Sequence, residues 1–300
     1  MKFGKPSSKE ELDNIDLSLP ADHPDTSRNL SKGKQPVKVY IGCAKWGRKE
    51  WVGLIYPEGT KERDFLQQYV KNFNSIELNT TFYSIKKENV ESWTSQAPDG
   101  FKFCPKFSRT ISHLKRLNDD SKRFTDYFLE AAYSFGDKLG PSFLQMPNNF
   151  MPKYLDRLAD YIRDIPEDFP MFLELRHTDW FTDPVVYDET FHLLEENGRG
   201  AVITDVAMRR DVLHQRLTNT KAFVRFNGYN FHPTDFTRLD QWVERIKIWI
   251  DAGLEELYFY PHQEEDVHVP KTCDYIINKL NQTCGLDIQN TDLKIDMNSL

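Results

Sequence analysis

The stretch "MFLELRHTDWFTDPVVYDETFHLLEENGRGAVITD" (171–205) decides the fold class, because it contains one complete strand–helix–strand unit. The short apolar runs 171–176 and 201–205 predict buried strands. Residues 184–197 between them have helical spacing and begin with a proline, which is common at the first helical position. A helix that joins two buried strands is typical of a parallel sheet. This unit therefore predicts an α/β fold.

The same pattern recurs along the chain. Eight short apolar runs predict strands at residues 38–43, 75–79, 101–107, 142–146, 171–176, 201–205, 222–227 and 256–260. Amphipathic helices are clearest at residues 61–72, 121–138, 152–164, 184–197, 236–251 and 267–281. Eight such units suffice to close a parallel sheet, so we predict a single (β/α)8 barrel of the TIM type. An open dinucleotide-binding sheet is disfavoured, because "IGCAKWG" (41–47) lacks the G-x-G-x-x-G pattern.

Both ends of the chain are expected to lie outside this barrel. Residues 1–36 are rich in Ser, Pro, Asp and Lys and show no sustained periodicity. We therefore expect an N-terminal extension that is either disordered or draped over the barrel. The barrel itself is predicted to span residues 37–283, and residues 284–300 form a C-terminal tail.

Composition limits the classes of protein to which the chain can belong. At 300 residues and 39% hydrophobic, it can bury a sizeable core. Its net charge of -7 disfavours nucleic-acid binding through a general basic surface. Cys43, Cys104, Cys273 and Cys284 have no CxxC spacing, as in proteins of a reducing cytoplasm. We find no signal peptide and no run long enough to cross a bilayer, so we expect a cytoplasmic protein without a membrane partner. We make no prediction of its oligomeric state.

Polar residues recur near the carboxyl ends of the predicted strands, where barrel enzymes have their active sites. Successive residues of a strand point to opposite faces, and we expect the polar set to face inward together. Its members are Glu77, Asn79, Lys106, Gln145, Glu174, Arg176, Asp205, Arg225, Asn227 and Tyr260.

Four separated motifs resemble, in order and spacing, the YecE-like family called domain of unknown function 72. They are "SIELNTTFY" (75–83), "KFSRTISHLKRL" (106–117), "LGPSFLQMPNNF" (139–150) and "LELRHTDWF" (173–181). The resemblance covers roughly residues 38–281 and implies a TIM-type barrel, but it implies no reaction.

The chain also departs from the family pattern. Asn227 stands where the family usually has His, and residues 260–263 replace a Tyr-Phe-Asn-Asn run. Lys45 stands where a small residue is usual. The resemblance therefore implies a ligand set that differs from that of typical members.

Positive charge is concentrated at or just beyond the strand ends of this otherwise acidic chain. The residues concerned are Lys106, Arg109, His113, Arg176, His177 and Arg225. An anionic group on a ligand is the simplest reason for such a concentration. The alternative is a structural ion network, in which Arg176 and Arg225 neutralise Glu77, Glu174 and Asp205.

We predict an enzyme that acts on a small anionic or phosphorylated metabolite, such as a sugar phosphate or a nucleotide, with the reaction left open. Lys106, Arg176 and Arg225 would bind the anion, with Arg109, His113, Asn79, Gln145 and Asn227 nearby. Glu77, Glu174 or Asp205 would move protons, with His177 and His113 as alternatives. Aromatic rings that follow the strands would form pocket walls, and we select Trp46, Tyr83 and Trp180.

Three other functions stay open. The pocket would capture an anion or a nucleic-acid end without turning it over. Glu77 and Glu174 would form a glycosidase-like carboxylate pair. A divalent metal would be held by Glu77, Glu174, Asp205 and His177 in a hydrolase or an isomerase, although neighbouring Lys and Arg residues disfavour it and we predict no cofactor. The charged run "PHQEEDVHVP" (261–270) is interpreted as a solvated loop.

Overall fold

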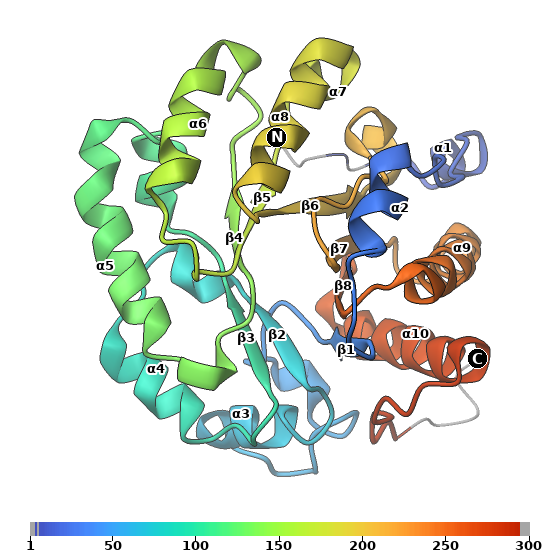
Figure 1. Cartoon of the computed structure of the whole chain (residues 1–300). Helices are drawn as coiled ribbons and strands as arrows, with labels where there is room; N and C mark the ends of the chain where they lie inside the picture. The colour runs from blue at the N-terminus through green and yellow to red at the C-terminus, as the bar shows by residue number, and fades with distance from the viewer. Residues whose placement is uncertain (1–3, 5, 295–300) are drawn as a thin grey trace.

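Eight strands occupy the centre of the molecule, and helices surround them (Figure 1). The structure is a computed structural model that describes residues 4 and 6–294. All eight predicted strands are present within or near the expected bounds. They are β1 (Lys38–Ile41), β2 (Ser75–Leu78), β3 (Lys102–Pro105), β4 (Ser142–Gln145), β5 (Met171–Glu174), β6 (Gly200–Asp205), β7 (Lys221–Asn227) and β8 (Glu256–His262).

The strands form a six-stranded sheet in the order β1-β8-β7-β6-β5-β4 and a two-stranded sheet of β2 and β3. Every pair of neighbours is parallel, which establishes a mixed α/β fold. Regular pairing is interrupted between β1 and β2 and between β3 and β4, which we call the β1/β2 junction and the β3/β4 junction. The predicted parallel sheet is thus present, whereas a continuously paired barrel is not.

Helices connect most successive strands, as predicted, and further helices precede β1 and follow β8. They are α1 (Glu10–Asp13), α2 (Pro24–Leu30), α3 (Phe65–Tyr69), α4 (Lys87–Thr94), α5 (Lys122–Tyr133), α6 (Leu155–Asp164), α7 (Asp179–Thr182), α8 (Pro184–Glu196), α9 (Pro233–Ala252) and α10 (Val269–Cys284). The connection from β6 to β7 differs, because it contains only the 3-10 turn η8 (Ala207–Val212) in the described chain. Within the residues described, no helix is both long and apolar enough to span a membrane.

The N-terminal segment lies over the outside of the sheet, where α2 lies between α8 and α9 (Figure 1). The Asn29 side chain donates to the Leu217 carbonyl at 3.0 Å, and Arg28 pairs with Glu195 of α8 at 2.7 Å. Leu30 is part of the main hydrophobic core. This segment therefore covers the region that the β6–β7 connection leaves without an α-helix.

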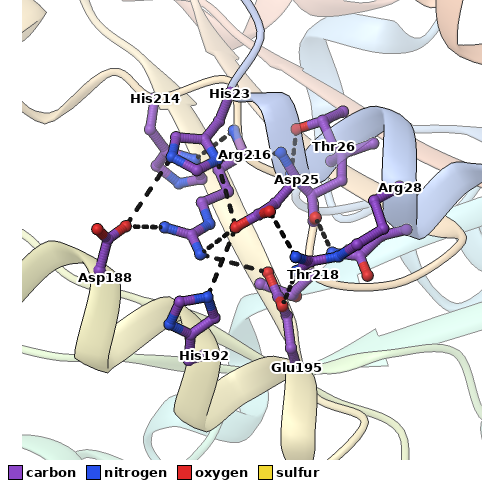
Figure 2. Close-up of polar contacts among 12 residues, drawn as sticks. His23, Asp25, Thr26, Arg28, Asp188, His192, Glu195, His214, Arg216 and Thr218 are labelled. Carbon is purple, nitrogen blue, oxygen red and sulfur yellow. Dashed lines mark hydrogen bonds and ion pairs between the residues drawn. The ribbon is translucent and has the colours of Figure 1, made fainter.

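A buried arginine ties α2 to α8, as Figure 2 shows. The fully buried Arg216 guanidinium donates to Asp25 of α2 and to Asp188 of α8, both at 2.6 Å. Glu195 lies 3.5 Å from the same guanidinium. Because the guanidinium is a cation and its acceptors are carboxylates, its hydrogen bonds to α2 and to α8 are both charge-assisted. We call these four residues the Arg216 cluster.

Side chains from seven of the eight strands pack into a separate hydrophobic cluster inside the sheet, and β8 contributes two of them. It consists of Tyr40, Cys104, Phe143, Phe172, Val202, Phe223, Tyr258 and Tyr260. Strand β2 contributes Ser75 instead, whose hydroxyl lies 2.5 Å from that of Tyr260. A Cβ at Gly200 would lie only 2.1 Å from the Phe172 ring, so this layer leaves no room for a side chain there. We call this layer the inner layer, and it defines which face of each strand points inward.

Candidate functional site

Charged side chains lie on the inward face of the strands, one step beyond the inner layer toward the carboxyl ends. Glu77, Gln145, Glu174 and Arg225 are each two residues beyond an inward residue on their own strand, and Lys106 directly follows β3 with the same parity. With Arg176 beyond β5, these side chains form the ion network: Glu77, Lys106, Gln145, Glu174, Arg176 and Arg225. The sequence prediction that these residues share one face is confirmed.

Arg225 of β7 is the centre of the ion network. Its Nε and Nη2 donate to the two oxygens of Glu77 at 2.8 and 2.9 Å. Its Nη1 donates to Oε2 of Glu174 at 2.8 Å. All three side chains are buried. Because every nitrogen of this guanidinium already donates to a carboxylate, we assign Arg225 to holding the two carboxylates in place.

Three side chains at the rim of the site complete the contacts of the carboxylates. Asn79 donates to Glu77 Oε1 at 2.7 Å, and His262 Nε2 lies 3.1 Å from Glu77 Oε2. Arg176 Nε donates to Glu174 Oε1 at 2.6 Å. The side chains of Arg176 and His262 are 18% and 20% exposed, so a ligand outside the sheet can reach them.

Both glutamates are held in their ionised form. Burial alone would raise the pKa of Glu174, but the charges of Arg176 and Arg225 outweigh it and lower the pKa to about 2. Burial acts in the same way on Glu77, and Arg225 and His262 hold its pKa well below the usual range. Neither carboxyl group therefore carries a proton near neutral pH.

Lys106 differs from the other cations of the network because it contacts no carboxylate directly among the described residues. Its Nζ donates to Gln145 Oε1 at 2.9 Å, and the Gln145 amide donates in turn to Glu174 at 2.8 Å. The amine lies over the rings of Phe82 and Phe143, 4.6 and 5.6 Å from their centroids. Burial and the charge of Arg225 lower the pKa of Lys106 to about 7.

The structure corrects the prediction for strand six, because Asp205 does not face the ion network. Val202 belongs to the inner layer, so alternation places Thr204 inward and Asp205 outward. The Asp205 carboxylate accepts from Arg238 and Trp242 of α9, at 3.1 and 2.8 Å. It is therefore a buried partner of the surrounding helices and not a proton carrier of this site.

Thr204 is a residue that sequence reasoning missed. It pairs with Arg225 in the β6/β7 register and is 4% exposed. Its hydroxyl is buried and has no hydrogen-bond partner among the residues that the structure describes. A buried polar group without a partner is uncommon and calls for an explanation. The sequence prediction selected the neighbouring Asp205 instead of Thr204, because a carboxylate at a strand end is the more obvious catalytic group.

The predicted aromatic walls are also corrected. Trp180 is fully buried in the main core, where its Nε1 donates to the Phe150 carbonyl at 2.7 Å. Tyr83 is 80% exposed, and Trp46 packs edge-on against Trp93 of α4. The rings that contact Lys106 are Phe143 of the inner layer and Phe82, in the turn η3 (Asn79–Phe82), directly before the predicted Tyr83.

The remaining predicted residues lie at the rim or beyond it. His113 is half-buried in contact with Phe82, and burial together with the charge of Lys106 lowers its pKa to about 4. Arg109 is exposed and directly precedes the short helical turn, residues 110–114, that contains His113. His177 accepts from the backbone of Asp179 at 3.2 Å, so its contact is with the start of α7. Asn227 ends β7, and its carbonyl accepts from Arg238.

His262 is the second residue that sequence reasoning missed. Strand β8 continues to His262, two residues past the predicted end, and there His262 pairs with Asn227 of β7. The interpretation of residues 261–270 as a solvated loop is therefore wrong at this position. The family resemblance leads one to expect an imidazole at position 227 of β7, and here His262 supplies one from the neighbouring strand.

Two further features lie away from the ion network. Within the described chain, Asp25, His192 and Glu195 are close enough together to hold a metal ion. Figure 2 shows that they surround Arg216, whose guanidinium already supplies the positive charge there. A cavity of about 610 Å³ lies between α5 and α6, lined by Leu129, Tyr161 and neighbouring residues.

Comparison with known proteins identifies the family. The model of the family described as "protein of unknown function DUF72" matches residues 40–293. The chain belongs to the DUF72 family. Among relatives, the UPF0759 protein YecE of Escherichia coli K12 is 26% identical over 264 residues, covering 82% of this chain and 93% of YecE. The UPF0759 protein YunF of Bacillus subtilis is 28% identical over 205 residues, covering 64% of this chain and 71% of YunF.

Solved structures of DUF72 proteins share the fold. A DUF72 protein of Enterococcus faecalis V583 superimposes with a TM-score of 0.64 at 17% identity, covering 85% of this chain and 100% of that one. A DUF72 protein of Thermotoga maritima superimposes with a TM-score of 0.54 at 20% identity, covering 81% and 96%. The predicted membership of the YecE-like family is therefore confirmed.

Proposed function

We propose that this DUF72 protein is an enzyme that acts on a small anionic or phosphorylated metabolite at the carboxyl ends of the strands. The observation that carries this proposal is the charge balance of the ion network. Two ionised carboxylates, Glu77 and Glu174, face two guanidiniums and the Lys106 amine. When the Lys106 amine is protonated, the network carries one cation in excess, and in a site shielded from water this favours an anionic ligand.

The barrel architecture belongs to the same proposal. At the β1/β2 junction, Glu77 N donates to the Cys43 carbonyl at 3.1 Å. At the β3/β4 junction, Phe107 N donates to the Phe143 carbonyl at 3.0 Å. These bonds, with a second one at the β3/β4 junction from Gly140 N to the Phe103 carbonyl at 2.7 Å, support a ring that closes through two loosely paired junctions. In such a barrel the ion network would lie at the mouth, where TIM-type enzymes bind substrates.

The geometry supports distinct roles for the charged groups. Arg176 is partly exposed at the rim, so we assign it to the anionic group of the substrate. Lys106 has an amine that is neutral part of the time near neutral pH, so we assign it to the chemical step. The lowered pKa values of Glu77 and Glu174 argue against a glycosidase-like pair, because its general acid needs a raised pKa.

Other ligand classes are less well supported by the same contacts. The oxygens of Glu77 and Glu174 already accept from guanidiniums, which compete with a metal ion for the same positions. Capture of an anion or of a nucleic-acid end without turnover is the alternative that uses the same cations. This alternative differs from the enzyme proposal in one respect, because the protein would release the bound compound chemically unchanged.

A ligand screen tests the proposal. Full-length protein is melted with ribose 5-phosphate, AMP, inorganic phosphate and a short oligonucleotide, each with and without Mg²⁺. We expect a sugar phosphate or nucleotide to raise the melting temperature, by an amount equivalent to about 2.7 kcal/mol at 100 times its Kd. Arg176→Gln and Lys106→Met should abolish the rise, while Arg163→Gln, a change at a 59% exposed surface residue, should keep it.

The outcomes separate the functions. Turnover of the stabilising compound, followed by mass spectrometry of the mixture, distinguishes an enzyme from a binding protein. Stabilisation by the oligonucleotide alone would favour the nucleic-acid alternative. If no anion stabilises the protein, or if stabilisation persists in both site variants, the anion-binding site is not at the ion network.

A further inference from the structure

We propose that Lys106 forms an imine with the carbonyl carbon of its substrate, which makes the substrate an aldehyde or ketone that also carries a carboxylate or phosphate. This inference rests on the proposed function, because it places the anionic group of the same compound at Arg176. It adds the chemical class of the substrate and the covalent bond through which the enzyme acts.

The first support is the hydrogen bonding of the Lys106 amine. An amine that attacks a carbonyl must present a free electron pair, and a direct ion pair with a carboxylate would keep it protonated. Lys106 Nζ bonds to the neutral amide of Gln145, which separates it from Glu174. The structure thus holds the amine in place through a neutral group.

The second support is the surroundings of the same amine. The faces of Phe82 and Phe143 lie next to Nζ, and the side chain as a whole is 8% exposed. The charges of Arg225, Arg176 and the ionised glutamates also act on this amine. Desolvation beside other cations is the arrangement that activates lysine as a nucleophile, and the pKa of about 7 agrees with it.

The third support is the Thr204 hydroxyl. It is buried, has no hydrogen-bond partner within the described part of the chain, and faces the same interior as Arg225, with which Thr204 pairs across the β6/β7 register. A hydroxyl in this state is available to hydrogen-bond an oxygen of a bound compound. We assign it to an oxygen of the substrate, which would supply the partner that the hydroxyl lacks.

The proposed step is balanced without another reactant. The electron pair of the neutral amine forms the N–C bond, and the carbonyl π electrons move to oxygen, which takes up one amine proton. The resulting hydroxyl leaves as water with the second amine proton, while the nitrogen electron pair forms the C=N bond. The amine and the carbonyl compound are thus converted to an imine and one water molecule.

Trapping the imine tests this step. Full-length protein is incubated with pyruvate or dihydroxyacetone phosphate and then treated with sodium borohydride, which reduces an imine to a stable amine. We expect a single covalent adduct in the intact mass, mapped to Lys106 by peptide analysis. Lys106→Arg should keep the positive charge and lose the adduct. Lys45→Arg is the matched control, because Lys45 follows β1 but donates to Asp266 at 2.8 Å.

If neither pyruvate nor dihydroxyacetone phosphate reacts, a measurement without substrate tests whether the Lys106 amine is nucleophilic. Reductive methylation with formaldehyde and cyanoborohydride at pH 7 forms an imine at each accessible amine, and the rate is followed for each lysine. We expect Lys106 to react at least tenfold faster than Lys45. Equal or slower reaction at Lys106 would overturn the imine proposal. The imine proposal would also be overturned if pyruvate or dihydroxyacetone phosphate stabilised the protein but gave no borohydride adduct. That result would still support the proposed anion site.

Discussion

Removal of Arg225 should cost the molecule much of its stability, because Arg225 is the shared partner of two buried carboxylates. Arg225→Met would leave Glu77 and Glu174 without three charge-assisted hydrogen bonds. Removing one partner of a buried ion pair typically costs about 3–5 kcal/mol. We expect a loss of that size in the free energy of unfolding, measured by urea denaturation at pH 7.

Arg176→Gln is the comparison for this change. Of the two glutamates, Arg176 donates to Glu174, and its side chain is partly exposed. Water can therefore replace part of the hydrogen bonding that Glu174 loses when Arg176 is changed. We expect it to cost clearly less than Arg225→Met. Equal stability of Arg225→Met and the unmodified protein would mean that the ion network does not form in solution.

At the scale of single elements, the position of a strand end decided what could be inferred from sequence. Alternation along β5 and β7 placed Glu174 and Arg225 inward correctly, because apolar residues flank them on both sides. In β6 the polar residues Thr204 and Asp205 are adjacent, so the pattern does not show which of them faces inward. In β8 the continuation to His262 depends on pairing with β7, which is a long-range contact without a local signal.

The segment between η8 and β7 offers a pH-dependent prediction. His214 Nε2 lies 3.1 Å from the Val202 carbonyl, and its Nδ1 accepts the backbone N–H of Arg216 at 3.3 Å. Burial lowers the pKa of His214 from 6.5 to about 4. In the unfolded chain the ring therefore binds its proton at a higher pH than in the folded protein. Its contribution to stability is present above pH 6.5 and is lost as the pH falls toward 4.

We expect this group to account for a loss on the order of 2–3 kcal/mol between neutral pH and pH 4. His214→Gln keeps an amide donor for Val202 but cannot titrate. Its free energy of unfolding, measured by urea denaturation at several pH values, should therefore fall less steeply with pH than that of the unmodified protein. Parallel curves for the two proteins would contradict a lowered pKa for His214.

At the scale of the whole molecule, the alternation of strands and helices was sufficient to predict a parallel α/β fold. The sequence could not reveal that α2 lies between α8 and α9, because short polar segments such as residues 1–36 have no periodicity of their own. Their order depends on partners far along the chain, including Arg216 for Asp25 and Leu217 for Asn29. The two interruptions of pairing, at the β1/β2 and β3/β4 junctions, are likewise long-range features that no single strand encodes.

Gly42 tests the β1/β2 junction, because the two strands approach each other closely there. A Cβ at this position would lie 1.9 Å from the Ser75 carbonyl oxygen and 2.7 Å from the Tyr69 hydroxyl. That hydroxyl accepts from Cys43 N at 2.7 Å and donates to the Ser75 carbonyl at 2.8 Å, so it joins the strands. Gly42→Ala must therefore push β1 and β2 apart.

We expect Gly42→Ala to lower the free energy of unfolding by about 3 kcal/mol or more, because backbone cannot yield as a flexible side chain does. Hydrogen exchange should accelerate at the Glu77 amide, which donates to Cys43, and stay slow within β7. Gly47→Ala is the matched control, since nothing lies within 4 Å of its Cβ position and its change should stay within about 0.5 kcal/mol. If the Glu77 amide already exchanges rapidly in the unmodified protein, the ring is open at this junction, and the proposed closed barrel is wrong even though both sheets remain.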